Sequence, residues 1–240
     1  MNFIPYAELN AIYNKVKKYD NNYFNSIIFP QSNFDLNSLY KDYPNFKDRI
    51  HSDGKSKQIR SNAFEKFPEI FVKEKSQFNN LGIYGIENHE RTYRYINPKY
   101  IEKAGIIDKY KVIVPQANGS GAIGEVLSTP LIGEPLIGEP LIGYTQSFIA
   151  IGMFDNEGCA KACLKYLKGK FSRALLGTLK ITQNNASPEI WSNVPLQDFT
   201  DKSDIDWSKS IHEIDLQLYK KYGLDQNEID FIESHIKEMK

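Results

Sequence analysis

The sequence has little of three features that would narrow its function at once. Its 240 residues include two cysteines, Cys159 and Cys163, and four histidines, none of them at the spacing of a zinc site. No apolar run approaches the ~20 residues of a membrane span, and no basic segment followed by an apolar one opens the chain. We therefore expect a protein of the reducing cytoplasm, without structural zinc and away from membranes.

The formal net charge is zero, but the charges are unevenly distributed. Residues 1–115 carry 18 Lys and Arg against 13 Asp and Glu, whereas residues 201–240 carry 6 against 10. Residues 161–180 contain six basic side chains and no acidic one. A polyanion would dock on these first two parts and be repelled by the tail. The alternative is an ordinary mixed surface, which the balanced total favours.

Hydrophobic periodicity predicts both helices and strands. Apolar residues recur at helical spacing over residues 6–19, and an aromatic-rich segment over residues 30–54 indicates turns instead of regular structure. Apolar or alternating runs predict strands at residues 81–86, 91–96, 110–114 and 148–152. The sequence thus predicts an α+β fold, with a mixed or antiparallel sheet, flanking helices and a C-terminal helical tail.

The second half of the sequence is predicted to be mainly helical. Asp155 or Asn156 caps one helix, residues 170–182 form the next, and Asp225 with Glu228 forms a capping box for the last. We expect residues 1–200 to form one domain. Residues 201–240 are expected to form a helical tail that packs on that domain or on a partner.

The triplet Leu-Ile-Gly occurs three times at a period of five residues, beginning at Leu131, Leu136 and Leu141, each time after Pro. Five matches neither the helical nor the strand period, and Pro at every fifth position forbids a continuous hydrogen-bonded ladder. We expect an extended, turn-rich excursion produced by local duplication. A role of the repeat number in specificity is the alternative.

Several segments in a fixed order carry a resemblance to a known family. They include Lys-Phe-Ser-Arg-Ala-Leu-Leu at residues 170–176, Val-Pro-Leu-Gln-Asp-Phe at 194–199, and the strand with its glycine loop at 110–119. With the strand at 144–152 and the last two helices, they resemble the C-terminal target-recognition region of restriction–modification enzymes built around a TaqI-like adenine-N6 DNA methyltransferase. The resemblance implies that the chain recognises double-stranded DNA, without a cofactor, together with a methyltransferase or restriction subunit.

The sequence lacks the catalytic motifs of such a methyltransferase. It has no Asn-Pro-Pro or Asp-Pro-Pro followed by an aromatic residue, and Asn97-Pro98-Lys99-Tyr100 lacks the second Pro. The match to G-x-G-x-x-G at residues 119–124 follows a strand but precedes no helix, so it indicates a loop and not a cofactor site. We predict no catalytic residue and no metal site, and whether the chain is an enzyme stays open, with a non-catalytic role favoured.

The alternative function is Mg²⁺-dependent DNA cleavage by a restriction endonuclease. Its candidate carboxylates lie at Asp53-Gly54-Lys55 and Glu74-Lys75, which are short matches that arise by chance in such a sequence. A third alternative is an interaction module whose acidic tail docks a methyltransferase, with DNA affinity only in the complex.

The candidate DNA-binding residues are basic and amide side chains. Lys170, Arg173 and Lys180 are expected to hold phosphates, and Gln116, Asn118, Gln183 and Asn184 are expected to reach base edges. Ser120 belongs to the same loop as Asn118, and Asn185 to the same polar run as Asn184. Three further candidates are Arg91, Arg94 and Lys111.

Overall fold

The computed structural model describes residues 4, 6–50, 56–118 and 132–239. Its strands form two sheets. The four-stranded sheet is antiparallel, in the order β1 (Ile28–Phe29), β7 (Phe148–Phe154), β4 (Tyr110–Pro115), β5 (Leu136–Gly138). The three-stranded sheet is mixed, with β2 (Leu81–Glu87) between antiparallel β3 (Glu90–Ile96) and parallel β6 (Ile142–Tyr144). The α+β prediction is confirmed.

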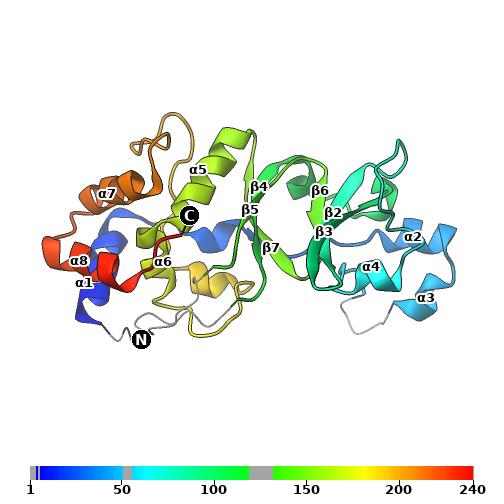
Figure 1. Cartoon of the computed structure of the whole chain (residues 1–240), viewed down its shortest axis with the longest axis horizontal. Helices are drawn as coiled ribbons and strands as arrows, with labels where there is room; N and C mark the ends of the chain where they lie inside the picture. The colour runs from blue at the N-terminus through cyan, green and yellow to red at the C-terminus, as the bar shows by residue number, and fades with distance from the viewer. Residues whose placement is uncertain (1–3, 5, 51–55, 119–131, 240) are drawn as a thin grey trace.

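The helices lie at the two ends of the molecule, with the sheets between them (Figure 1). One end holds α2 (Leu36–Asp42), α3 (Phe46–Arg49) and α4 (Ala63–Lys66). The other end holds the remaining α-helices, which are α1 (Ala7–Tyr19), α5 (Glu157–Lys168), α6 (Lys170–Leu176), α7 (Ile211–Lys221) and α8 (Gln226–His235). Short 3₁₀ helices connect the elements at Phe24–Ile27, Pro98–Tyr100, Gly105–Asp108 and Pro188–Trp191.

The first and last α-helices, α1 and α8, pack against each other. The ammonium of Lys15 lies 2.6 Å from the Glu228 carboxylate. Glu228 also completes the capping box with Asp225, as the sequence predicts. The buried apolar residues of α7 and α8 belong to the same hydrophobic cluster as Leu9 of α1 and Val112 of β4. The acidic tail therefore packs on the rest of the chain.

Two repeats of Leu-Ile-Gly contribute to different sheets. Leu136–Gly138 forms β5 at the edge of the four-stranded sheet, and Ile142–Tyr144 forms β6 at the edge of the three-stranded sheet. Leu141 between them has φ +63° and is 40% exposed. The described repeats thus form short edge strands, because each Pro interrupts the ladder within a few residues.

Two predictions of secondary structure are wrong. Residues 30–54, expected to be a loop, contain α2 and α3, because the Asp35 carboxylate caps the backbone N–H of Ser38 and Leu39 is fully buried. The helix expected at residues 170–182 ends at Leu176. After Leu176 the hydroxyl of Thr178 donates to the Leu175 carbonyl at 2.6 Å, which provides an alternative to continued helical bonding.

Candidate nucleic-acid interface

Two segments distant in the sequence meet beside the end of β4. They are residues 116–118, which follow β4, and residues 180–187, which follow α6; we call them the loop pair. The backbone N–H of Asn118 donates to the Gln183 carbonyl at 3.0 Å, and that of Asn185 donates to the Gln116 carbonyl at 2.7 Å. An antiparallel bridge joins Ala117 to Asn184 between these bonds. The loop pair is thus a short two-stranded unit built on the four-stranded sheet.

β4 fixes the first segment. The backbone N–H of Gln116 donates to the carbonyl of Ser147 at 2.8 Å, and Pro115 pairs with Phe148 of β7 directly before it. Val114 is fully buried, so this end of β4 is held on both of its sides by packing and pairing. The positions of Gln116 and Asn118 follow from a rigid strand.

The buried side chain of Asn185 connects the two segments of the loop pair. Its side chain is fully buried, and its Nδ2 donates to the Pro115 carbonyl at 2.9 Å and to Asn118 Oδ1 at 3.1 Å. The indole Nε1 of the buried Trp191 donates to the Asn185 carbonyl at 2.9 Å. In the sequence Asn185 directly follows Asn184 in one polar run, and the sequence does not show that Asn185 is buried and Asn184 exposed. The sequence-based prediction therefore missed the residue that holds the site together.

The Lys180 side chain supports the loop pair from the protein interior. It is 2% exposed, and its Nζ donates to Asn118 Oδ1 at 2.7 Å. Burial lowers the pKa of its ammonium to about 8. A phosphate cannot reach an ammonium that is enclosed in this way. The prediction that Lys180 holds a phosphate is corrected accordingly: the buried Lys180 ammonium binds the Asn118 side chain and stabilises the loop pair.

The exposed part of the loop pair consists of polar side chains, the small Ala117 and the large apolar Ile181. Thr182, Gln183 and Asn184 are exposed, and Ile181 is 86% exposed. Asn184 Oδ1 accepts from the backbone N–H of Ala186 at 2.8 Å, which leaves its amide nitrogen facing outward as a donor. The fold thus brings together the backbones of the four predicted base-contact residues, Gln116, Asn118, Gln183 and Asn184. Gln183 and Asn184 are exposed, whereas Asn118 Oδ1 accepts from the buried Lys180 and Asn185 side chains, so its predicted base contact is corrected to a supporting role.

Arg91 lies near the loop pair, since its guanidinium is 5.8 Å from the ring centroid of Phe148, the strand partner of Pro115. Its Nη1 donates to the Glu134 carbonyl at 3.0 Å, and the Glu134 carboxylate lies 3.7 Å away. Arg94 is turned elsewhere, since it pairs with Glu87 and lies over the Phe64 ring. Of the two arginines of β3, Arg91 therefore packs on Phe148, which pairs with Pro115 at the end of β4, and Arg94 does not.

The other predicted basic residues stabilise the fold. Arg173 is 2% exposed, and its Nε donates to the carbonyls of Lys168 and Gly169 at 3.1 and 3.2 Å, while Nη2 donates to that of Lys237. Burial lowers the pKa of its guanidinium to about 10. Lys170 Nζ lies 2.6 Å from the Glu233 carboxylate of α8. The phosphate contacts predicted for Arg173 and Lys170 are corrected, because these cations fasten α6 to the C-terminal helices.

The predicted DNA contact of Lys111 is also corrected, because its side chain is buried. It is fully buried at the start of β4, and its Nζ donates to the carbonyls of Ile106 and Lys109 at 2.7 and 2.8 Å. Burial lowers the pKa of its ammonium to about 8. The dense cations of residues 161–180 follow the same pattern: Lys165 Nζ caps the carbonyls of Trp207 and Lys209 at 2.9 and 2.7 Å. Lys161 of the same run is exposed and pairs with Glu157 at 2.9 Å, so the run does not form a continuous basic surface.

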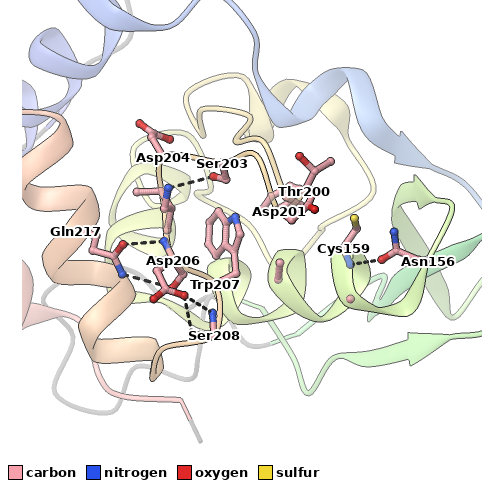
Figure 2. A pocket seen from close by; sticks show the side chains of 14 residues that line it. Asn156, Cys159, Thr200, Asp201, Ser203, Asp204, Asp206, Trp207, Ser208 and Gln217 are labelled. Carbon is pink, nitrogen blue, oxygen red and sulfur yellow. Dashed lines mark hydrogen bonds between the residues drawn. The ribbon is translucent and has the colours of Figure 1, made fainter.

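A pocket separate from the loop pair lies among the helices (Figure 2). This pocket of about 930 Å³ is lined by the start of α5, the segment of residues 199–208 and Gln217 of α7. Asp206 Oδ1 accepts from the Ser208 backbone and hydroxyl at 3.0 and 2.6 Å, and Asp204 lies 3.0 Å from the Lys221 ammonium. Two of its three carboxylates, Asp204 and Asp206, are therefore engaged in an ion pair and a turn, and the sequence-based prediction did not find the pocket.

Three further observations bear on function. Within residues 4, 6–50, 56–118 and 132–239, no group of three or more His, Cys, Asp or Glu side chains is arranged to hold a metal ion. Asp53-Gly54-Lys55, the glycine motif at residues 119–124 and Ser120 lie outside the described residues. None of the helices in the described ranges combines the length and the apolar character that a bilayer crossing requires.

The comparisons with known proteins add no assignment. No family model matches the chain, and a search of curated proteins finds no match either.

Proposed function

We propose that this chain binds double-stranded DNA sequence-specifically, as the target-recognition part of a restriction–modification system. The observation that carries the proposal is the loop pair: the exposed amides of Gln183 and Asn184 lie on a segment that pairs with residues 116–118 and is supported by buried side chains. Amide side chains are the groups that pair with adenine in the major groove, and their placement on a fixed scaffold provides specificity. The resemblance to target-recognition regions supports the same function.

Phosphate contacts in this proposal do not come from the basic helix, since Lys170, Arg173 and Lys180 are used internally. Among the predicted cations, Arg91 keeps a partly exposed side chain, at 35%, which lies over the ring of Phe148, the strand partner of Pro115. The excess of basic residues over residues 1–115 supplies the general attraction to DNA. Affinity is therefore expected to be moderate and to fall with salt.

The direct test is a selection of duplexes from a randomised pool with the purified full chain, followed by anisotropy titration of the enriched duplex. We expect one enriched motif, bound at least ~10³-fold more tightly than unrelated duplex. Gln183→Ala should lower the affinity for the motif more than for unrelated DNA. Gln226→Ala, which removes an exposed amide on the acidic α8, is the matched control and should change neither. A pool that shows no enrichment contradicts the proposal.

In this proposal the chain acts in the cytoplasm together with a methyltransferase or restriction subunit that supplies the chemistry. Co-elution with a methyltransferase encoded beside it tests the partnership. Incubation of the chain alone with plasmid and Mg²⁺ tests the alternative of an endonuclease. Discrete cleavage products would show that the chain cuts DNA and would contradict a role in recognition alone.

A further inference from the structure

Ile181 is the most exposed large apolar side chain in the described part of the protein, at 86%. It directly follows Lys180, which is 2% exposed. A large aliphatic side chain that projects fully into water gains nothing from burial in the isolated chain. A single exposed apolar residue is ordinary by itself. The surroundings of Ile181 make this one different.

The backbone around Ile181 is held on both sides. Lys180 is fixed by its bond to Asn118 Oδ1 at 2.7 Å, and the Gln183 carbonyl accepts from the Asn118 backbone at 3.0 Å. Asn118 thus holds the residues that flank positions 181 and 182. Ile181 therefore lies in a short exposed segment whose two ends, Lys180 and Gln183, are both hydrogen-bonded to Asn118.

Gln183 lies two residues further on and is also exposed. Among the described residues, its side-chain amide has no hydrogen-bond partner, so both its donor and its acceptor are available. An amide with both groups available matches the N6–H donor and N7 acceptor of adenine in the major groove. Thymine, the partner of adenine, presents a C5-methyl group in the same groove, and an aliphatic side chain is the group that recognises it.

The spacing allows the two contacts to be made together. Residues two apart have Cα atoms separated by at most about 7 Å, within the ~12 Å width of the major groove. Both side chains are exposed and belong to one segment that is held by Asn118. One segment therefore offers a hydrogen-bonding group and an apolar group at the separation of neighbouring base edges.

We propose that Gln183 and Ile181 together read A·T sequence in the major groove, with the Gln183 amide on adenine N6 and N7 and Ile181 on the C5-methyl of a thymine in the same or the adjacent base pair. This mode of reading rests on the DNA-binding function proposed above. It names the chemistry that the loop pair recognises.

The test uses the duplex enriched in the selection, with each thymine replaced in turn by deoxyuridine, which removes only the methyl group. One replacement should weaken binding by the wild-type chain about fourfold, the value expected for one buried methyl group. Ile181→Ala should bind the thymine duplex about as weakly and lose the difference between thymine and deoxyuridine at that position. Ile181→Val, which retains an apolar contact, should restore part of the difference.

A parallel series replaces each adenine by 7-deazaadenine, which removes the N7 acceptor. The wild-type chain should lose affinity at one position, and Gln183→Ala should be insensitive there. Leu216→Ala, which truncates another exposed leucine-sized side chain on α7, should leave every substitution effect unchanged.

The outcomes separate the two levels of the proposal. A selected motif that contains no A·T pair, or a thymine effect that persists in Ile181→Ala, overturns this reading mode and leaves DNA recognition intact. The absence of any preferred duplex overturns the proposed function, and the reading mode with it. Because Ile181 and Gln183 are exposed, their variants should retain the wild-type thermal unfolding curve, which excludes misfolding as the cause.

Discussion

Lys180 Nζ and Asn118 Oδ1 are joined by a 2.7 Å hydrogen bond across 62 residues of sequence, and this bond couples the segment after α6 to the end of β4. Asn118 Oδ1 also accepts from the buried Asn185 side chain. A buried lysine thus determines where two exposed recognition residues, Gln183 and Asn184, are presented. The predictions below test this support and the corrected roles of the basic residues.

Neutralising the buried Lys180 should change the pH dependence of stability. Its pKa of about 8 lies below that of a lysine in the unfolded chain, so between about pH 8 and 10.5 the unfolded state binds more protons. The free energy of unfolding should therefore rise with pH across that window. Lys180→Met should lose this rise, by about 1–3 kcal/mol in all, in denaturant titrations at pH 7.5 and 10.

Lys111→Met is the matched control for Lys180→Met, because burial also lowers the pKa of Lys111 to about 8. It should lose a similar pH dependence. Lys111 lies at the opposite end of β4 from the loop pair, so its replacement should leave duplex affinity unchanged, whereas Lys180→Met should weaken it. Equal effects of both variants on affinity would contradict the anchoring role of Lys180.

Arg173→Ala should destabilise the fold without changing how binding depends on salt. The guanidinium is the donor to three carbonyl groups, which would be left without it, at a cost of about 2–4 kcal/mol. Thermal unfolding gives the stability, and anisotropy titrations at several salt concentrations give the slope. A slope that decreases by about one unit would instead make Arg173 a phosphate contact.

Asp215 should make stability fall as pH rises from about 4 to 6. The buried carboxylate accepts from the backbone N–H groups of Lys170 and Phe171 at 2.9 and 3.1 Å, and burial raises its pKa to about 6. Between the unfolded pKa of about 4 and the folded value, the native state binds more protons, so stability is lost as pH rises through that window. Asp215→Asn removes the titrating group, and its stability should be flatter over this range in urea titrations.

Asn185→Ala should impair both stability and recognition. The Pro115 carbonyl and Asn118 Oδ1 would lose a donor in a buried setting, which costs about 1–3 kcal/mol. Asn184→Ala removes an exposed side chain and one exposed hydrogen bond, to the Ala186 backbone N–H, and serves as the comparison, with a smaller stability loss of about 0.5–1 kcal/mol. If Asn185→Ala were as stable as Asn184→Ala, the buried amide would not be what holds the loop pair together.

Local signals in the sequence determined most of the secondary structure. The spacing of Leu9, Ile12 and Val16 predicted α1, and the capping box of Asp225 and Glu228 predicted the start of α8. These features depend on neighbours within four residues, so one chain read from end to end contains them. The amide side chains of the loop pair were also recognisable, because Asn and Gln are concentrated in the sequence around residues 116–118 and 182–185.

Tertiary structure alone decided which polar and basic residues face solvent. Arg173, Lys111 and Lys180 look like surface cations in the sequence, but each side chain is enclosed and bonded to groups contributed by other segments. A side chain is buried or exposed according to contacts made across tens of residues, such as the 62 between Asn118 and Lys180. Local periodicity contains no information about such contacts, since it reports which face of one element is apolar and not what packs against it.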